Sequence, residues 1–162
     1  MLLLGQILLQ ESTDPAEHAR AADLFRQAAA QGNADAQYNL GVCLRRGLGV
    51  DPDDHEAERL YTAAAKQGHP SAQLALGSLR AQSATTDEDW AEIATWFRMA
   101  SDAGHPTAMF SLAQLLESGR GVTTDTETAL KLYQRAAGAG LSEAAAEVQR
   151  VEAELKSALP DV

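Results

Sequence analysis

The sequence predicts an all-α fold, a right-handed superhelical solenoid of antiparallel helix pairs, and three observations predict it. First, glycines recur with a spacing of 36 residues, at Gly32, Gly68, Gly104 and Gly140. Second, other positions keep this register, including the aromatic column Phe25, Tyr61, Phe97 and Tyr133. Third, apolar residues within each copy recur at helical spacing, and 32 alanines, about a fifth of the chain, favour closely packed helices.

Each repeat is expected to contain two helices, one of about 14 and one of about 15 residues. The repeated glycine ends one helix, because a left-handed residue costs least there. Asn33 then caps the next helix, while Pro70 and Pro106 occupy first helical positions, where a missing N–H is tolerated. A second break comes at the Gly-x-Gly-Val segments 47–50 and 119–122. Acidic residues at 51–54 and 87–89 complement the dipoles of the helices that follow.

The repeat predicts a single repeat domain over residues 1–162. A partial first repeat covers 1–31, and full repeats cover 32–67, 68–103 and 104–139. A capping helix is expected over 140–159, because its apolar residues share one face and its charged residues lie elsewhere. These apolar residues are Leu141, Ala144, Ala145, Val148, Val151 and Leu155.

Two phrases of the sequence resemble the Sel-one-like repeat, a relative of the tetratricopeptide repeat. They are Ala36-x3-Leu40-Gly41-x5-Gly47-x-Gly49-Val50 and Ala57-x2-Leu60-Tyr61-x2-Ala64-Ala65-x2-Gly68. The resemblance covers essentially the whole chain and departs from the family pattern in two places. Leu44, Arg80 and Leu116 occupy the usual aromatic position, and the third loop, 83–86, has no glycine. We therefore expect that loop to be irregular.

The first residues are apolar on nearly every side of the expected helix. Leu4-Gly5 aligns with Leu40-Gly41, so this segment corresponds to the first helix of a repeat. A helix that is apolar all round needs cover. We expect self-association through Leu2, Leu3, Ile7 and Leu9, or masking by a segment that this sequence lacks. The segment is much shorter than the roughly 20 residues of a membrane span and does not resemble a signal peptide, so we expect no membrane insertion.

Charge and cysteine content exclude further classes. The chain has 13 basic and 23 acidic residues, a formal net charge of −10, which disfavours nonspecific binding to nucleic acid. The only cysteine, Cys43, aligns with Leu79 and Leu115 and is expected to be a small core residue. A cytoplasmic protein is expected from the sequence as it stands, and a periplasmic or secreted one if the N-terminus is truncated.

No enzyme motif was found, and we expect neither a catalytic residue, a metal nor a cofactor. His69 and His105 are equivalent positions of successive copies and fit the starts of helices better than a shared metal site. Adjacent repeats would hold them about 10 Å apart, whereas zinc requires nitrogens at about 2 Å from one ion. The acidic segments lack the ligand spacing of a calcium loop.

The remaining candidate is a surface for a protein or peptide. In tetratricopeptide relatives the helix with the Leu-Gly pair lines the concave face, and the resemblance implies that Tyr38, Leu74 and Phe110 lie there. The rest of the expected face comprises Val42, Arg45, Arg46, Ser78, Gln82, Gln114 and Glu117. Such a strip would suit an extended peptide or a helix. The alternative is that Tyr38, Leu74 and Phe110 are core residues between helices.

The sequence thus predicts a non-catalytic adaptor or scaffold, which the resemblance also implies, since bacterial members often serve signalling, envelope or host-interaction roles. One alternative is an immunity or inhibitor protein that occludes a toxin or enzyme. A remote alternative, a hydrolase or beta-lactam-binding protein, is suggested by a disulfide-rich branch of the family, from which the single cysteine departs.

Overall fold

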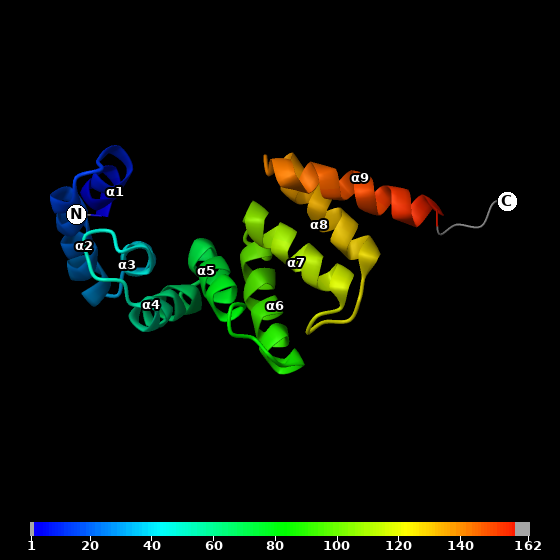
Figure 1. Cartoon of the computed structure of the whole chain (residues 1–162), viewed down its shortest axis with the longest axis horizontal. Coiled ribbons are helices and arrows are strands. Elements are labelled where there is room, and N and C mark those ends of the chain that lie inside the picture. The colour runs from blue at the N-terminus through cyan, green and yellow to red at the C-terminus, as the bar shows by residue number, and fades with distance from the viewer. Residues whose placement is uncertain (1, 158–162) are drawn as a thin grey trace. The chain divides into compact units, whose positions relative to one another are not determined.

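The computed structural model describes residues 2–157, and all regular secondary structure in this range is α-helical. The helices, labelled in Figure 1, are α1 (Leu2–Glu11), α2 (Pro15–Ala30), α3 (Ala34–Arg46), α4 (Asp54–Lys66), α5 (Pro70–Arg80), α6 (Asp87–Asp102), α7 (Pro106–Ser118), α8 (Thr126–Gly138) and α9 (Ser142–Ser157). The predicted all-α class is confirmed.

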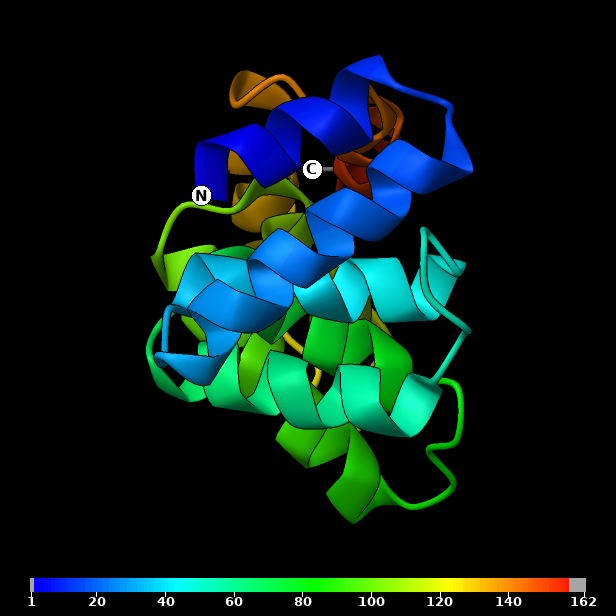
Figure 2. The same cartoon turned by 90° about the vertical axis from the view of Figure 1, so that its left-hand side faces the viewer.

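The chain divides after Leu76, within α5, into two compact units. In the first unit α1 packs on α2, α2 on α3, and α3 on α4, and Figure 2 shows α1 in dark blue beside α2. In the second unit α6 packs on α7, α7 on α8, and α8 on α9. Within each unit these helices therefore pack mainly on their neighbours in the chain, as in repeat proteins.

The glycine column ends the even-numbered helices with one recurring turn. Gly32, Gly68, Gly104 and Gly140 all have positive φ, between 84° and 95°. The residue after the glycine donates its N–H to a carbonyl in the last turn of the preceding helix, as from Asn33 to Ala28 at 3.3 Å. The same bond recurs three times, from His69 to Ala64, from His105 to Ala100 and from Leu141 to Ala136. The expected helix ends are confirmed.

The predicted helix starts are also present. The side chain of Asn33 accepts a hydrogen bond from the N–H of Ala36 at 2.8 Å, and α5 and α7 begin at Pro70 and Pro106. Asp53 accepts from the N–H of Glu56 at 3.0 Å. The loop after α5 is irregular, as expected: α5 has only 11 residues, and a capping box between Thr86 and Asp89 starts α6.

The cores of the first three helix pairs each contain an aromatic ring against a glycine. A Cβ added to Gly41 would lie 2.6 Å from the Tyr61 ring, and one added to Gly77 would lie 2.6 Å from the Phe97 ring. Gly5 and Phe25 repeat the contact at 2.7 Å. The missing side chain is thus what lets the two helices approach closely. Ala113 occupies the fourth position of the glycine column and is fully buried.

The two terminal helices differ in how well they are covered. Ala144 and Val151 of α9 are fully buried, but Ala145, which we expected on the same face, is exposed. It directly follows Ala144, and a helix turns about 100° per residue, which takes Ala145 away from α8. Residues 158 and 159 of the expected capping helix lie outside the described range.

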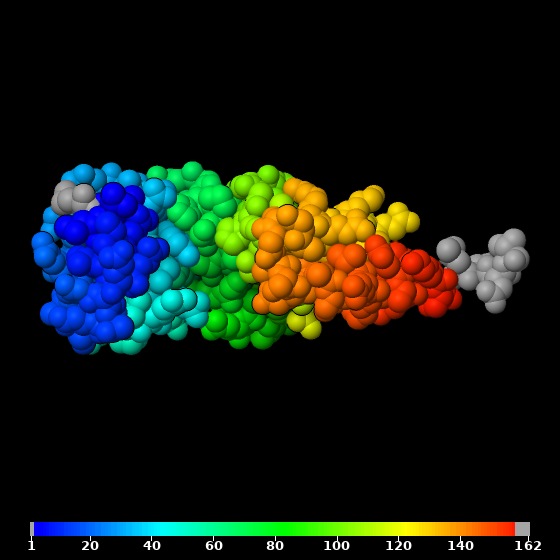
Figure 3. Space-filling view, turned by 90° about the horizontal axis from the view of Figure 1, so that it is seen from above, coloured from blue at the N-terminus to red at the C-terminus, as the bar shows by residue number. Residues whose placement is uncertain are grey.

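At the other terminus, Leu3, Leu4 and Ile7 of α1 are 69%, 42% and 39% exposed. Figure 3 shows the darkest blue atoms of this helix uncovered. An apolar patch is therefore present on α1, although the face buried by α2 includes Gly5.

Candidate functional site

In the first unit, the expected binding residues of α3 form a partly exposed strip. Tyr38, Val42 and Arg45 are half-buried, and Arg46 is exposed. The Tyr38 ring stacks on His69 at 4.8 Å between centroids and lies 5.9 Å from the Tyr61 ring. Tyr38 therefore contacts a neighbouring helix and also exposes part of its ring. It has features of both alternatives, a binding-face residue and a core residue between helices.

His69 is held by contacts within the first unit. Its Nδ1 accepts a hydrogen bond from the N–H of Ala72 at 3.1 Å, and its Nε2 lies 3.1 Å from a carboxylate oxygen of Asp35. His105 is likewise the residue immediately before α7. The predicted position of both histidines at helix starts is confirmed.

Two more expected residues of this unit are partly engaged by neighbours. The Nε of Arg45 lies 3.6 Å from a carboxylate oxygen of Asp54, at the start of α4. Leu74 of α5 is half-buried. Arg46 makes no ion pair within residues 2–157 and is the free cation of this strip.

In the second unit, Phe110 and Glu117 support the fold. Phe110 is half-buried and meets the ring of Tyr133 edge-on, at 5.3 Å between centroids. Glu117 accepts hydrogen bonds from the Tyr133 hydroxyl at 3.1 Å and from Arg150 at 2.8 Å. Burial, together with the hydrogen bond to Glu117, raises the pKa of Tyr133. Glu117 thus links α7 to α8 and α9.

A groove of about 500 Å³ lies between α5 and α7 in the second unit, and we call it the Trp90 groove. Its lining residues are Ser78, Ala81, Trp90, Phe97, Ser111, Gln114, Leu115, Ser118 and Arg120. The structure thus brings together Ser78 and Gln114 of the expected face, whereas Gln82 lies in the turn after α5 and outside the groove.

Trp90 and Arg120 were not predicted from the sequence. The guanidinium of Arg120 lies over the indole of Trp90, at 4.6 Å from its centroid. Arg120 belongs to the Gly-x-Gly-Val loop at 119–122. This loop lies close against α6 at Gly121, where an added Cβ would be 2.3 Å from the backbone of Trp90. Gly49 of the first unit makes the same approach to α2, because a Cβ added to it would lie 2.1 Å from the backbone nitrogen of Ala19. The signal in the sequence was the arginine between the two loop glycines.

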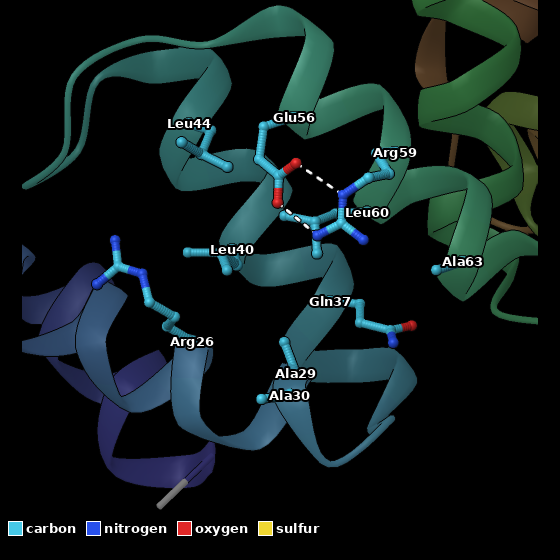
Figure 4. A pocket seen from close by; sticks show the side chains of 10 residues that line it. All are labelled: Arg26, Ala29, Ala30, Gln37, Leu40, Leu44, Glu56, Arg59, Leu60 and Ala63. Atoms are coloured by element: carbon cyan, nitrogen blue, oxygen red, sulfur yellow. Dashed lines mark hydrogen bonds and ion pairs between the residues drawn. The ribbon is translucent and has the colours of Figure 1, made fainter.

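A second depression, of about 400 Å³, lies in the first unit between α2, α3 and α4 (Figure 4). Leu40, Leu44 and Leu60 are among its lining residues. Glu56 and Arg59 at its rim pair with each other, with nitrogen–oxygen distances of 2.7 and 2.5 Å. The hydrogen bond from Arg59 lowers the pKa of Glu56. Arg26, which also lines the depression, pairs with Asp23. The charged groups of the lining are therefore already paired within the unit.

Groups suited to covalent or acid–base chemistry serve the fold. Burial raises the pKa of the Cys43 thiol to about 11, so little thiolate exists at neutral pH. The Nε2 of His18 lies 2.8 Å from the backbone oxygen of Ser12. In the part of the chain that the structure describes, no three His, Cys, Asp or Glu residues could together hold a metal ion. None of the helices described there is long and apolar enough to cross a bilayer.

The fold and its grooves define an α-helical repeat protein that offers surfaces for binding. The chain belongs to the Sel1 repeat family, whose profile matches residues 1–33, 34–69, 94–105 and 106–141, more than half of the sequence. The short third match follows a stretch that contains the irregular loop after α5. The Sel1 repeat fold generally mediates protein–protein interaction, and its members are typically non-catalytic scaffolds.

Two solved structures are similar to this chain. A Sel1 repeat protein from Oxalobacter formigenes has a TM-score of 0.82 and 27% identity over 95% of this chain and 61% of that one. A protective antigen of uropathogenic Escherichia coli strains, displaying an SLR fold, has a TM-score of 0.83 and 32% identity. That alignment covers 93% of this chain and 32% of the antigen. The present chain is thus shorter than either relative. No curated protein sequence matches it.

Proposed function

We propose that the chain is a non-catalytic adaptor that binds a protein or peptide through exposed residues of its odd-numbered helices, α3 in the first unit and the end of α5 with α7 in the second. The observation that carries this proposal is the Trp90 groove, because two residues expected from the repeat register, Ser78 and Gln114, both line it. Its volume of about 500 Å³ falls within the range of about 300–1,000 Å³ that is usual for binding pockets.

The side chains of this face support the proposal. Within the described residues, the side chains of Ser78 and Gln114 form no hydrogen bond with the rest of the chain and are exposed. In the first unit, Arg46 is exposed and Tyr38 is half-buried, both on α3. Arginine and aromatic side chains are enriched at protein-binding surfaces.

The experiment is affinity capture from native lysate with a blocked groove. We expect the variant Ser78→Arg with Gln114→Arg to lose the partner that the wild type captures, because two long side chains would fill the groove. The matched control, Thr95→Arg with Gln149→Arg, adds the same charge at exposed positions outside the groove and should retain the partner. Equal capture by both variants would contradict the proposal for this groove.

The identity of the captured proteins separates two forms of the function. An adaptor should retain several partners through the same face. A single partner, bound tightly and inactivated on binding, would instead favour the inhibitor or immunity alternative. Both require the groove, so the blocked-groove variant and its control test them equally.

A further inference from the structure

We propose that the Trp90 groove binds a short extended peptide segment that presents a carboxylate to Arg120 and an apolar side chain to the groove wall. This inference rests on the proposed function and specifies the chemistry of the partner. Three features of the molecule support it: the charge of Arg120, the free polar groups of the groove, and the uncharged residue at the equivalent loop position of the first unit.

Arg120 is a cation without a carboxylate partner. It is exposed, makes no ion pair within the described residues, and contacts the Trp90 ring at 4.6 Å. Arg80 pairs with Glu92 and Arg150 with three glutamates, whereas Arg98 and Arg135, like Arg120, form no ion pair within the described residues. Of these unpaired arginines, Arg120 alone lines the Trp90 groove. A guanidinium is planar and can bind a carboxylate with two parallel hydrogen bonds, and contact with an aromatic ring restricts its position.

The remaining walls suit an extended chain. Ser78, Ser111 and Gln114 have side chains that form no hydrogen bond with residues 2–157, so their donors and acceptors are available to a peptide backbone. Trp90, Phe97 and Leu115 supply the apolar part of the lining. A few free polar groups around an apolar surface bind and orient a ligand.

Comparison of the two units shows that loop folding does not require this pair. His18 and Leu48 lie 72 residues before Trp90 and Arg120, which is two repeat lengths. The Gly-Leu-Gly-Val loop at 47–50 nevertheless approaches α2 as closely as the Gly-Arg-Gly-Val loop approaches α6. The positive charge at position 120 is therefore additional to what the loop needs.

The surrounding charge restricts the partner further. Asp87 and Glu88 line a separate depression beside the same loop, and the chain has a net charge of −10. A strongly acidic peptide would be repelled at long range. The preferred segment therefore has one carboxylate next to an apolar residue, in a peptide that is neutral or basic overall.

The test begins with a phage-displayed library of random short peptides selected on the full chain. Synthetic copies are titrated against the Trp96→Phe variant, in which Trp90 is the only tryptophan and reports binding through its fluorescence. Affinities are then measured for Arg120→Leu, which creates the loop sequence found at 47–50, and for Arg98→Leu. Arg98 is exposed, lies outside the groove and carries the same charge, so it is the matched control.

We expect selected peptides to share a carboxylate at a fixed position. Arg120→Leu should weaken their binding about tenfold to a hundredfold, as for a lost charge-assisted hydrogen bond, and Arg98→Leu should leave it unchanged. Replacing the peptide carboxylate by an amide should cause the same loss in the wild type and no further loss in Arg120→Leu.

Three results would overturn the inference: recovery of no peptide, peptides without a required carboxylate, or equal binding to Arg120→Leu and wild type. The proposed function is decided separately by protein capture. The variant Ser78→Arg with Gln114→Arg could lose a captured protein that Arg120→Leu retains in full. This result would support the adaptor function and contradict the inference that Arg120 binds a carboxylate of the partner.

Discussion

At the scale of single residues, the two tyrosines of the α3–α4 pair, Tyr38 and Tyr61, differ in how much they are expected to contribute to stability. Tyr61 is 2% exposed, whereas Tyr38, on the adjacent helix, is half-buried. We expect Tyr61→Ala to lower the free energy of unfolding by about 3–5 kcal/mol, as for a large side chain removed from a core. Tyr38→Ala should cost about 1–2 kcal/mol, because part of its ring is already in water. Urea unfolding measures both. Equal losses would place Tyr38 in the core.

Two aspartates at helix starts should make stability depend on acid pH. Hydrogen bonds from the backbone of Thr85 and Thr86 lower the pKa of Asp89, and bonds from Thr128 lower that of Asp125. A carboxyl group whose pKa is lower in the folded state stabilises the protein above the unfolded pKa, and this contribution is lost as the pH falls through the folded pKa.

We therefore expect the urea midpoint to fall as the pH drops below the ordinary aspartate value of 3.8. In Asp125→Asn this decrease should be smaller, because asparagine still caps the helix but does not titrate. Urea titrations at neutral and acid pH measure the difference. The exposed Asp102→Asn, for which no such cap exists, is the control and should keep the wild-type decrease. An identical decrease in Asp125→Asn and wild type would contradict the assignment.

At the scale of elements, the second glycine of the Gly-x-Gly-Val loop is expected to be the least replaceable residue. Both Gly49 and Gly68 have positive φ, at 70° and 86°. A Cβ on Gly68 would meet nothing within 4 Å, whereas one on Gly49 would lie 2.1 Å from the backbone of Ala19. Gly68→Ala should thus cost only backbone strain, about 1–2 kcal/mol.

Gly49→Ala must also push the loop away from α2, so we expect it to cost more than about 3 kcal/mol or to prevent folding. Thermal unfolding of the two variants side by side gives the comparison, with Gly68→Ala as the control for strain alone. Similar unfolding temperatures would mean that the loop does not need its close approach to α2.

The sequence was sufficient to predict the elements because their ends depend on local chemistry. Glycine, asparagine and proline act through their own backbones, and Asn33, Pro70 and Gly32 lie where the repeat register predicts. The buried columns were predictable because apolar residues at helical spacing share one face of a helix. The irregular third loop was also predictable, since residues 83–86 lack the glycines that the other loops use.

The candidate site was only partly predictable because it depends on packing between segments distant in the sequence. Arg120 lies over Trp90 only after the loop has docked on α6. Glu117 was expected on a binding face, but in the structure it accepts hydrogen bonds from Tyr133 and from Arg150 of α9. The arginine between the two loop glycines was the only sequence signal for the first contact, and no sequence pattern indicated the second.

At the scale of the whole molecule, the distribution of charge and apolar surface separates one candidate self-association surface from the rest. Helix α1 carries no charged residue before Glu11, in a chain whose net charge is −10. Its exposed side chains include Leu3, Leu4 and Ile7. A second copy would therefore meet the least electrostatic repulsion at this helix, through a symmetric contact.

We expect the wild type to dimerise at concentrations of tens of micromolar, as measured by sedimentation. Leu3→Gln with Ile7→Gln should be monomeric, because it removes the apolar area that drives the contact. Met99→Gln is the control, because Met99 is an apolar residue of α6 that is 42% exposed and lies outside α1. This variant should dimerise as the wild type does. A monomeric wild type would contradict self-association through α1.

The central claim, that the Trp90 groove between α5 and α7 binds another protein, is tested most directly by site-specific photocrosslinking. A photoreactive amino acid is placed at Ser78 or Gln114 of the Trp90 groove, or at the exposed control positions Thr95 and Gln149. After irradiation in native lysate, we predict a discrete crosslinked protein from positions 78 and 114 and none from 95 and 149. The same crosslinks from all four positions, or from the control positions alone, would contradict the account.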